Sequence, residues 1–158
     1  LARALGCEIK LIGYVEETEG KLVCFVSPMA VPTSNPLARV DGVFNGVLIN
    51  ANMVGEVMFY GPGAGKLPTA SAVVADIVDI IAKRDTAAAP LGWVAADDAD
   101  VADFSAFSCR RMVITDKPCD GAVEAGGAYA YISEAMTETE ADALKASDAS
   151  IVAIYRML

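Results

Sequence analysis

The alternation of apolar and polar residues predicts strands along the first sixty positions. Four segments carry this pattern: residues 7–15, 22–27, 43–49 and 54–60. A polar turn separates the first two and a short segment separates the last two, so each pair is predicted to form a hairpin. The proline-bounded residues 29–35 predict a connection between the pairs, and Asn35 is expected to cap a short helical turn beginning at Pro36.

A glycine-rich loop follows the fourth segment and leads into an apolar helix. Gly61, Gly63 and Gly65 fall within five positions, and Pro68 stands where the first turn of a helix accepts proline. The helix is predicted to end near Arg84. Because its apolar residues cover more than one narrow stripe, we expect it to be buried on most sides.

The loop has two interpretations. Glycines before a helix let backbone N–H groups approach a phosphate, a carboxylate or the polar edge of a cofactor, and the helix start adds a positive dipole end. Alternatively, the glycines only relieve steric conflict in a tight turn. The spacing excludes a P-loop, because three residues separate Gly61 from Gly65 and Leu67 follows Lys66, and it also excludes the Gly-x-Gly-x-x-Gly fingerprint.

The last fifty residues predict a second group of strands with one helix. The strands are expected at residues 111–115, 128–133 and 151–156. Thr137 and Glu140 have the spacing of a capping box, which predicts a helix from that point. Residues 119–127 are too short and glycine-rich for a helix followed by another strand.

The segment between the two groups is predicted to be irregular. Residues 86–92 predict a linker, and Trp93 is expected to pack that linker onto the core. The acidic residues 97–103 are more typical of a solvated loop than of a calcium site, because the glycine and final glutamate of an EF-hand loop are missing.

Composition limits the classes of function. The 158 residues are 54% hydrophobic, enough for one sizeable core or two small ones, and carry a net charge of −9. This charge argues against nucleic-acid and anionic-membrane partners, and no segment is apolar for long enough to span a bilayer. The net charge is −1 up to residue 84 and −8 after it, which indicates two modules.

Cysteine and histidine usage restricts the chemistry. The four cysteines form no Cys-x-x-Cys pair, so no metal site is predicted and reduced thiols of a cytoplasmic protein are expected. The chain has no histidine, which removes Ser–His and Cys–His nucleophile pairs. No catalytic residue is therefore predicted in this chain.

Five blocks stand in a fixed order in the first half of the chain: residues 5–13, 26–32, 35–45, 54–65 and 67–77. Together they resemble the late catalytic region of homoserine dehydrogenase, and the resemblance covers about residues 1–84. That family interconverts aspartate semialdehyde and homoserine with NADP or NAD, on the route to threonine, methionine and isoleucine. The resemblance implies that Gly63, Ala64, Gly65 and Thr69 contact the cofactor near its nicotinamide end.

The resemblance also implies what this chain lacks. The family's Rossmann domain, and the acidic and lysine residues that bind homoserine and move the proton, have no counterpart here; Lys10 belongs to a different block. We therefore expect a carboxy-terminal fragment, inactive alone, of an enzyme with a small-molecule substrate. The alternative is a non-catalytic assembly module or an amino-acid-binding regulatory module.

Residues 110–118, Arg-Arg-Met-Val-Ile-Thr-Asp-Lys-Pro, are similar to the first strand and loop of an ACT domain, an amino-acid-sensing module often fused to this family. Because the next helix and strand are missing, the resemblance implies a module that joins subunits of a homo-oligomer rather than a working sensor. The expected fold is α+β, with a mixed or antiparallel sheet packed on helices, followed by a small ACT-like α/β sandwich. The expected division is a catalytic-region part at 1–84, a linker at 85–107 and a truncated ACT-like module at 108–158.

Overall fold

The structure, a computed structural model, describes residues 1–85, 95 and 97–158. The chain divides into two compact units. Unit 1 comprises Leu1–Ala38 and Ala96–Leu158, and unit 2 comprises Arg39–Ala95. The predicted linker at 86–92 and Trp93 lie outside the described residues.

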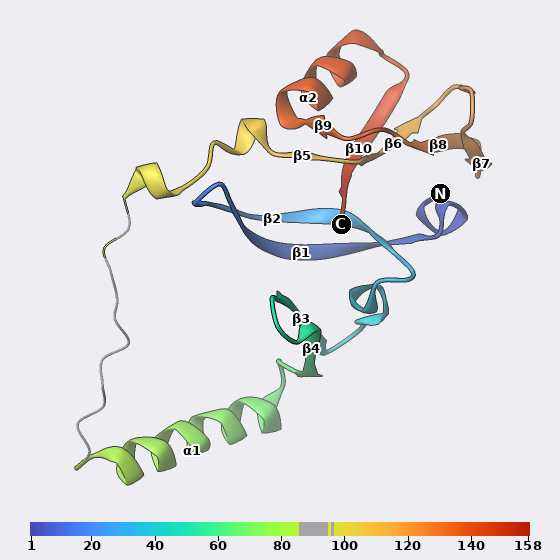
Figure 1. The fold of residues 1–158 in the computed structure, drawn as a ribbon. Helices are drawn as coiled ribbons and strands as arrows, with labels where there is room; N and C mark the ends of the chain where they lie inside the picture. Colours follow the sequence, from blue (N-terminus) through green and yellow to red (C-terminus); the bar gives the residue numbers. More distant parts are fainter. Residues whose placement is uncertain (86–94, 96) are drawn as a thin grey trace. The chain divides into compact units, whose positions relative to one another are not determined.

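A mixed sheet forms the body of unit 1 (Figure 1). Among the described residues its strands, in order across the sheet, are β1 (Cys7–Thr18), β2 (Lys21–Pro32), β10 (Ile151–Met157), β6 (Arg111–Thr115), β8 (Ala128–Ile132) and β7 (Val123–Ala125). β10 runs parallel to β2, and the other neighbouring strands are antiparallel. The predicted α+β fold with a mixed sheet is confirmed.

The first hairpin is longer than its sequence pattern indicates. β1 and β2 pair from Cys7 and Pro32 at one end to Thr18 and Lys21 at the other. The expectation that residues 29–32 belong to a connection is wrong, because they continue β2 as its most deeply buried part. Proline 32 ends the strand, where the loss of a backbone donor is tolerated.

The turn after β2 forms as predicted. The Leu37 N–H donates to Asn35 Oδ1 at 2.9 Å, and this cap opens the 3-10 helix η2 (Pro36–Arg39). Four further short elements lie in unit 1 and are not predicted from the sequence pattern: η3 (Asp98–Asp100), η4 (Phe104–Ala106), β5 (Ser108–Cys109) and β9 (Met136–Thr137). A 3-10 helix, η1 (Ala2–Leu5), precedes β1.

The carboxy-terminal strands and helix lie where the sequence predicts them. Thr137 caps α2 (Glu138–Ser147), because its hydroxyl accepts from the Glu140 N–H while the Glu140 carboxylate accepts from the Thr137 N–H. Residues 119–127 hold no helix, as predicted, but they do contain a short strand, β7, where the next helix and strand were both expected to be missing. Gly126 and Gly127 both take positive φ, and the tight turn they make lets β7 pair with β8.

The core of unit 1 joins the two ends of the chain. One cluster of buried residues contains Cys7, Ala30, Met112 and Met157, so it draws on the first hairpin and on the last strands together. The carboxy-terminal strands alone offer little apolar surface for a stable core. Their pairing with β2 supplies the missing surface from within the same chain.

Unit 2 consists of the second predicted hairpin and the predicted helix. The hairpin is formed by β3 (Phe44–Ala51) and β4 (Gly55–Pro62), and the helix is α1 (Lys66–Lys83). The expectation that α1 is buried on most sides is wrong for this chain, because none of its residues is buried and Leu67 is 79% exposed. A two-stranded hairpin offers too little surface to cover a helix that is apolar around most of its circumference.

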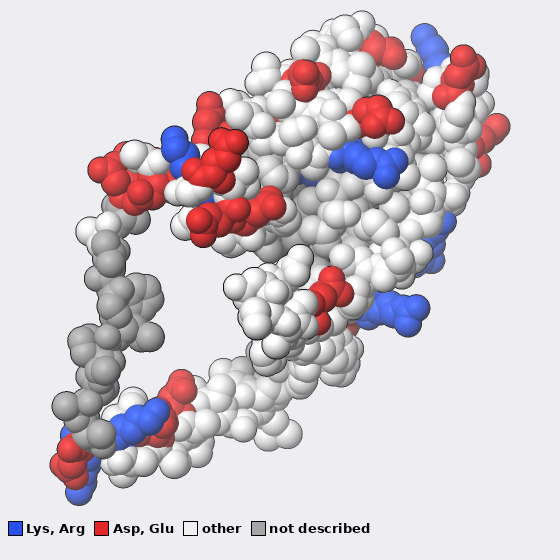
Figure 2. Space-filling model, in the orientation of Figure 1, with Lys and Arg blue, Asp and Glu red and all other residues white. Residues whose placement is uncertain are grey.

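α1 therefore presents an apolar surface. On the face drawn in Figure 2, its charged side chains gather toward its carboxyl end, where Lys83 pairs with Asp79 at 2.8 Å. Contiguous apolar surface of this kind is typical of sites that contact another protein surface, a membrane or a ligand. None of the described helices is both long enough and apolar enough to cross a membrane.

Candidate functional site

The glycine-rich loop links the end of β4 to the start of α1. β4 ends at Pro62 and α1 begins at Lys66, so Gly63, Ala64 and Gly65 form the connection. Thr69 follows in the first turn of α1, and its N–H donates to the Gly65 carbonyl oxygen at 3.1 Å. The structure thus brings the four predicted cofactor-contacting residues to one turn, where all four are exposed.

The amino end of α1 is open to a ligand. Gly65 occupies the N-cap position, and among the described residues no side chain caps the helix there. The backbone N–H groups of the first turn carry the positive end of the helix dipole. An exposed, uncapped turn with two glycines fits the polar edge of a cofactor, which would complete the hydrogen bonding of those N–H groups.

The same glycines also have local structural roles. A Cβ atom at Gly63 would collide with Asn45 Nδ2, and Gly65 has φ 126°, a value that residues with a side chain rarely adopt. A Cβ at Gly61 would meet no atom within 4 Å. The steric interpretation of the loop therefore holds for Gly63 and Gly65 and not for Gly61, and it is compatible with cofactor contact.

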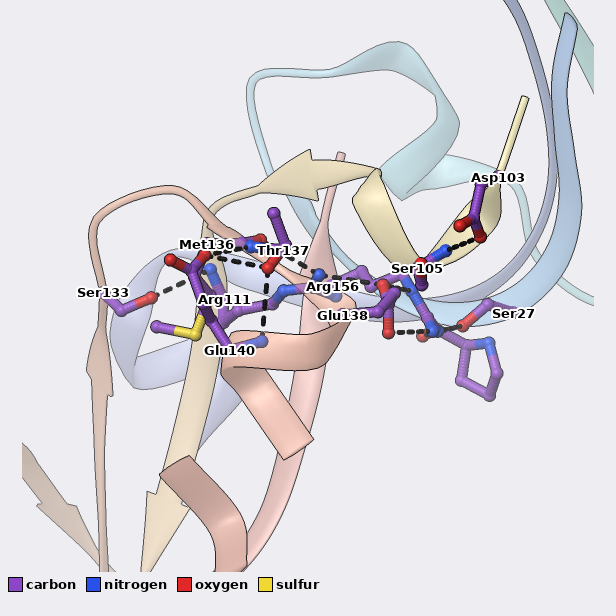
Figure 3. A network of polar contacts seen from close by, with 11 residues as sticks. Ser27, Asp103, Ser105, Arg111, Ser133, Met136, Thr137, Glu138, Glu140 and Arg156 are labelled. Atoms are coloured by element: carbon purple, nitrogen blue, oxygen red, sulfur yellow. Dashed lines mark hydrogen bonds and ion pairs between the residues drawn. The ribbon is translucent and has the colours of Figure 1, made fainter. Parts of the chain in front are cut away.

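A second polar cluster, which the sequence does not reveal, lies in unit 1. Arg111 and Arg156 reach the same carboxylate, that of Glu138, from the neighbouring strands β6 and β10 (Figure 3). Arg156 donates from Nε and Nη2 to the two oxygens of Glu138 at 2.7 and 2.6 Å, and from Nη1 to the Ser27 hydroxyl at 2.7 Å. Arg111 donates from Nη2 to Glu138 Oε1 at 2.8 Å and to the Met136 carbonyl oxygen at 3.2 Å.

Burial strengthens this cluster. The Arg111 side chain is 2% exposed, and the Arg156 guanidinium carbon lies 5.0 Å from the ring centroid of Phe104 and 5.5 Å from that of Phe25. Burial alone would raise the pKa of Glu138, but the hydrogen bonds and charges of the two arginines outweigh it and hold the pKa below its usual value. The sequence signal for this cluster was Arg111 at the start of a strand whose next three residues are apolar.

The chain thus combines an α+β fold with an exposed glycine loop at the amino end of α1. The family model for homoserine dehydrogenase matches residues 1–78, which include the whole loop and most of α1. Homoserine dehydrogenase of Neisseria gonorrhoeae is 53% identical over 88 residues, which cover 54% of this chain and 20% of that protein. Homoserine dehydrogenase of Mycobacterium bovis is 36% identical over 155 residues, which cover 80% of this chain and 35% of that protein.

Solved structures extend the likeness beyond the matched sequence. The crystal structure of a homoserine dehydrogenase from Thiobacillus denitrificans has a TM-score of 0.73 and 26% identity, and the alignment covers 99% of this chain and 44% of that one. This chain belongs to the homoserine dehydrogenase family. The aligned residues cover 20% to 44% of the length of these relatives.

Proposed function

We propose that this chain is the carboxy-terminal part of a homoserine dehydrogenase that interconverts aspartate semialdehyde and homoserine with NADP or NAD in threonine, methionine and isoleucine biosynthesis. The observation that carries the proposal is the family match over residues 1–78, because it contains the complete exposed loop. NADP or NAD supplies the hydride donor or acceptor of this reaction. The acid–base groups for homoserine lie outside this chain.

In this proposal the loop closes one side of the cofactor site. Gly63, Ala64 and Gly65 offer backbone N–H groups near the nicotinamide end, and the Thr69 hydroxyl adds a donor at the first turn of α1. Two observations support this role: all four residues are exposed, and no side chain of the described residues occupies the N-cap position of α1 in their place.

According to this proposal, the 158-residue chain alone does not oxidise homoserine. We expect no oxidation of homoserine by the purified chain with either cofactor, and measurable oxidation by the full-length enzyme that carries these residues. Turnover by the chain alone, in a preparation free of other dehydrogenases, would contradict the assignment of the chemistry to the remaining part of the enzyme.

Glycine substitutions in the full-length enzyme separate the two interpretations of the loop. Gly63→Ala should raise the cofactor KM, but it also forces Asn45 to move, so it lowers the melting temperature as well. The double variant Asn45→Ala with Gly63→Ala removes that clash and leaves the added methyl group. If the KM of the double variant stays above that of Asn45→Ala alone, the added methyl group obstructs the cofactor, which supports cofactor contact. If the two KM values are equal, Gly63 is only structural.

Gly61→Ala is the matched control for this series. Its Cβ meets no neighbouring atom within 4 Å, and Gly61 is not among the proposed contact residues. We expect its melting temperature and its cofactor KM to stay close to those of the wild type. An equal KM increase in Gly61→Ala and Gly63→Ala would argue for a general loss of loop rigidity instead of a local contact.

For the carboxy-terminal part we propose an ACT-like module that supports assembly of a homo-oligomer without sensing threonine. The support is the strand order β10, β6, β8, β7 with one helix, α2, and the short turn where an ACT domain has another helix. Isothermal titration with threonine and sedimentation of the chain test the two halves separately. Saturable threonine binding contradicts the first half, and a strictly monomeric chain contradicts the second.

A further inference from the structure

β1 forms one edge of the sheet in unit 1, and it is long for an edge strand. It covers Cys7–Thr18 and pairs along its whole length with β2, without a register shift. Among the described residues no other strand pairs with β1, whereas β7, at the opposite edge, has only three residues. Natural edge strands are commonly short or interrupted by proline or a β-bulge, which prevents pairing with another chain. β1 has none of these three features.

The turn between β1 and β2 determines which backbone groups β1 presents at its outer edge. Glu19 and Gly20 form a two-residue turn with positive φ at both positions, so Thr18 and Lys21 are a hydrogen-bonded pair. The backbone groups of even-numbered residues of β1 therefore point toward β2, and those of odd-numbered residues point away from it. Gly13, in the middle of β1, thus presents its N–H and C=O groups at the outer edge.

The exposed apolar side chains of β1 are arranged symmetrically about Gly13. Leu11 is 73% exposed and Val15 is 71% exposed, and both lie two positions from Gly13 on one face of the strand. A second β1, antiparallel to the first and centred on Gly13, would place Leu11 opposite Val15 on both sides of the centre. This arrangement would remove apolar surface of all four side chains from water.

The charges on the other face of β1 favour the same register. With Gly13 at the two-fold axis, Lys10 of each chain lies opposite Glu16 of the other, so two pairs of opposite charge form. An axis at Ile12 would place Glu8 opposite Glu16 twice, which is unfavourable. An axis one residue beyond Gly13 would leave Lys10 and Glu16 opposite uncharged residues. The sequence of β1 is therefore self-complementary in the register that also pairs its exposed apolar residues.

We propose that β1 pairs with β1 of a second copy of this chain, antiparallel and centred on Gly13, so that the sheets of the two copies become continuous. The interface is closed by two-fold symmetry, because each copy uses the same edge once. Its backbone hydrogen bonds satisfy the N–H and C=O groups that β1 presents at its outer edge. This surface lies outside the proposed ACT-like module and is independent of the role in assembly proposed for that module.

Sedimentation of the 158-residue chain and its charge-reversed variants tests the proposal. Lys10→Glu and Glu16→Lys each place like charges opposite each other at two positions, so each should raise the dimer dissociation constant by about tenfold. The double variant Lys10→Glu with Glu16→Lys restores opposite charges and should return the constant to near the wild-type value. Because Lys10 and Glu16 lie about 20 Å apart along one strand, this rescue cannot arise from a contact within one chain.

Lys21→Glu is the matched control, because it makes the same charge change at an exposed residue of β2. We expect it to leave the dissociation constant close to the wild-type value. A wild-type chain that is monomeric at tens of micromolar overturns the proposal. A dimer that the two single variants do not weaken, or that the double variant does not restore, also overturns it, and that result leaves the assembly proposed for the carboxy-terminal module standing.

Discussion

Replacing Glu138 by glutamine removes the carboxylate that Arg111 and Arg156 share. The exposed fractions of the two arginine side chains are 2% and 22%, so little solvent is available to compensate the loss. Breaking a buried ion pair by removing one partner costs about 3–5 kcal/mol. Glutamine keeps one acceptor oxygen and Glu138 is itself 16% exposed, so we expect the lower part of that range, about 3 kcal/mol.

That loss is large relative to the stability of a domain. Small domains unfold with free energies of about 5–15 kcal/mol, so the variant loses a substantial part of its total stability. For a domain of about 100 residues, each kcal/mol lowers the melting temperature by about 4–8 °C, which predicts a decrease of more than about 10 °C.

Urea and thermal unfolding of the wild type and two variants measure this effect. Glu124→Gln is the control, because it removes an exposed carboxylate of β7 and so changes net charge by the same amount. We expect Glu138→Gln to lower the urea midpoint at an unchanged slope, and Glu124→Gln to leave it in place. Equal midpoints for the two variants would show that the arginine pair does not depend on Glu138, and the energetic argument above would be wrong.

Three further predictions concern pH and capping. The pKa of Glu138 is lower in the folded state than in the unfolded state. Its contribution to stability is therefore complete above the unfolded pKa and is lost as pH falls through the folded pKa. On acid titration, the free energy of unfolding of Glu138→Gln should decrease less steeply than that of the wild type. Burial raises the pKa of Tyr14 to about 12, together with the hydrogen bond to Glu16 and the negative charge of Glu16. Tyr14→Phe should therefore remove the last step of the ultraviolet phenolate titration. Because that folded pKa exceeds the unfolded one, the contribution of Tyr14 to stability is lost above about pH 10. Thr137→Ala should lower the free energy of unfolding by about 1 kcal/mol in urea. Thr139→Ala, two residues further along in the first turn of α2, should change it much less.

Features that depend on neighbouring residues could be predicted from the sequence. The capping box at Thr137 and the cap at Asn35 involve residues two or three positions apart, and the structure confirms both. The strands of both hairpins follow their own alternation of apolar and polar residues. In these places the local pattern and the tertiary structure favour the same conformation.

Features that depend on distant contacts could not be predicted. Glu138 receives Arg111 from 27 positions away, and Ser27 accepts from Arg156 across 129 positions. The exposure of α1 had the opposite cause. Its apolar sequence indicates a helix that is covered, but the described residues of unit 2 leave all of its side chains exposed or only partly buried. A helical pattern of apolar residues indicates that a face of the helix is covered, but it does not indicate which chain segment covers that face.

The pairing of β10 with β2 places the last strand in the same sheet as the region that the family model matches. The family model ends at residue 78, yet the fold aligns with a homoserine dehydrogenase over 99% of the chain. β10 completes the sheet through backbone contacts: the Leu158 N–H donates to the Ala30 carbonyl oxygen at 3.1 Å, and Arg156 lies opposite Met29. Backbone pairing needs only an alternating apolar strand, so many sequences satisfy it. The folding unit therefore joins residues at both ends of the chain, and the proposed module boundary between residues 85 and 107 separates stretches of sequence that share a single core in the folded protein.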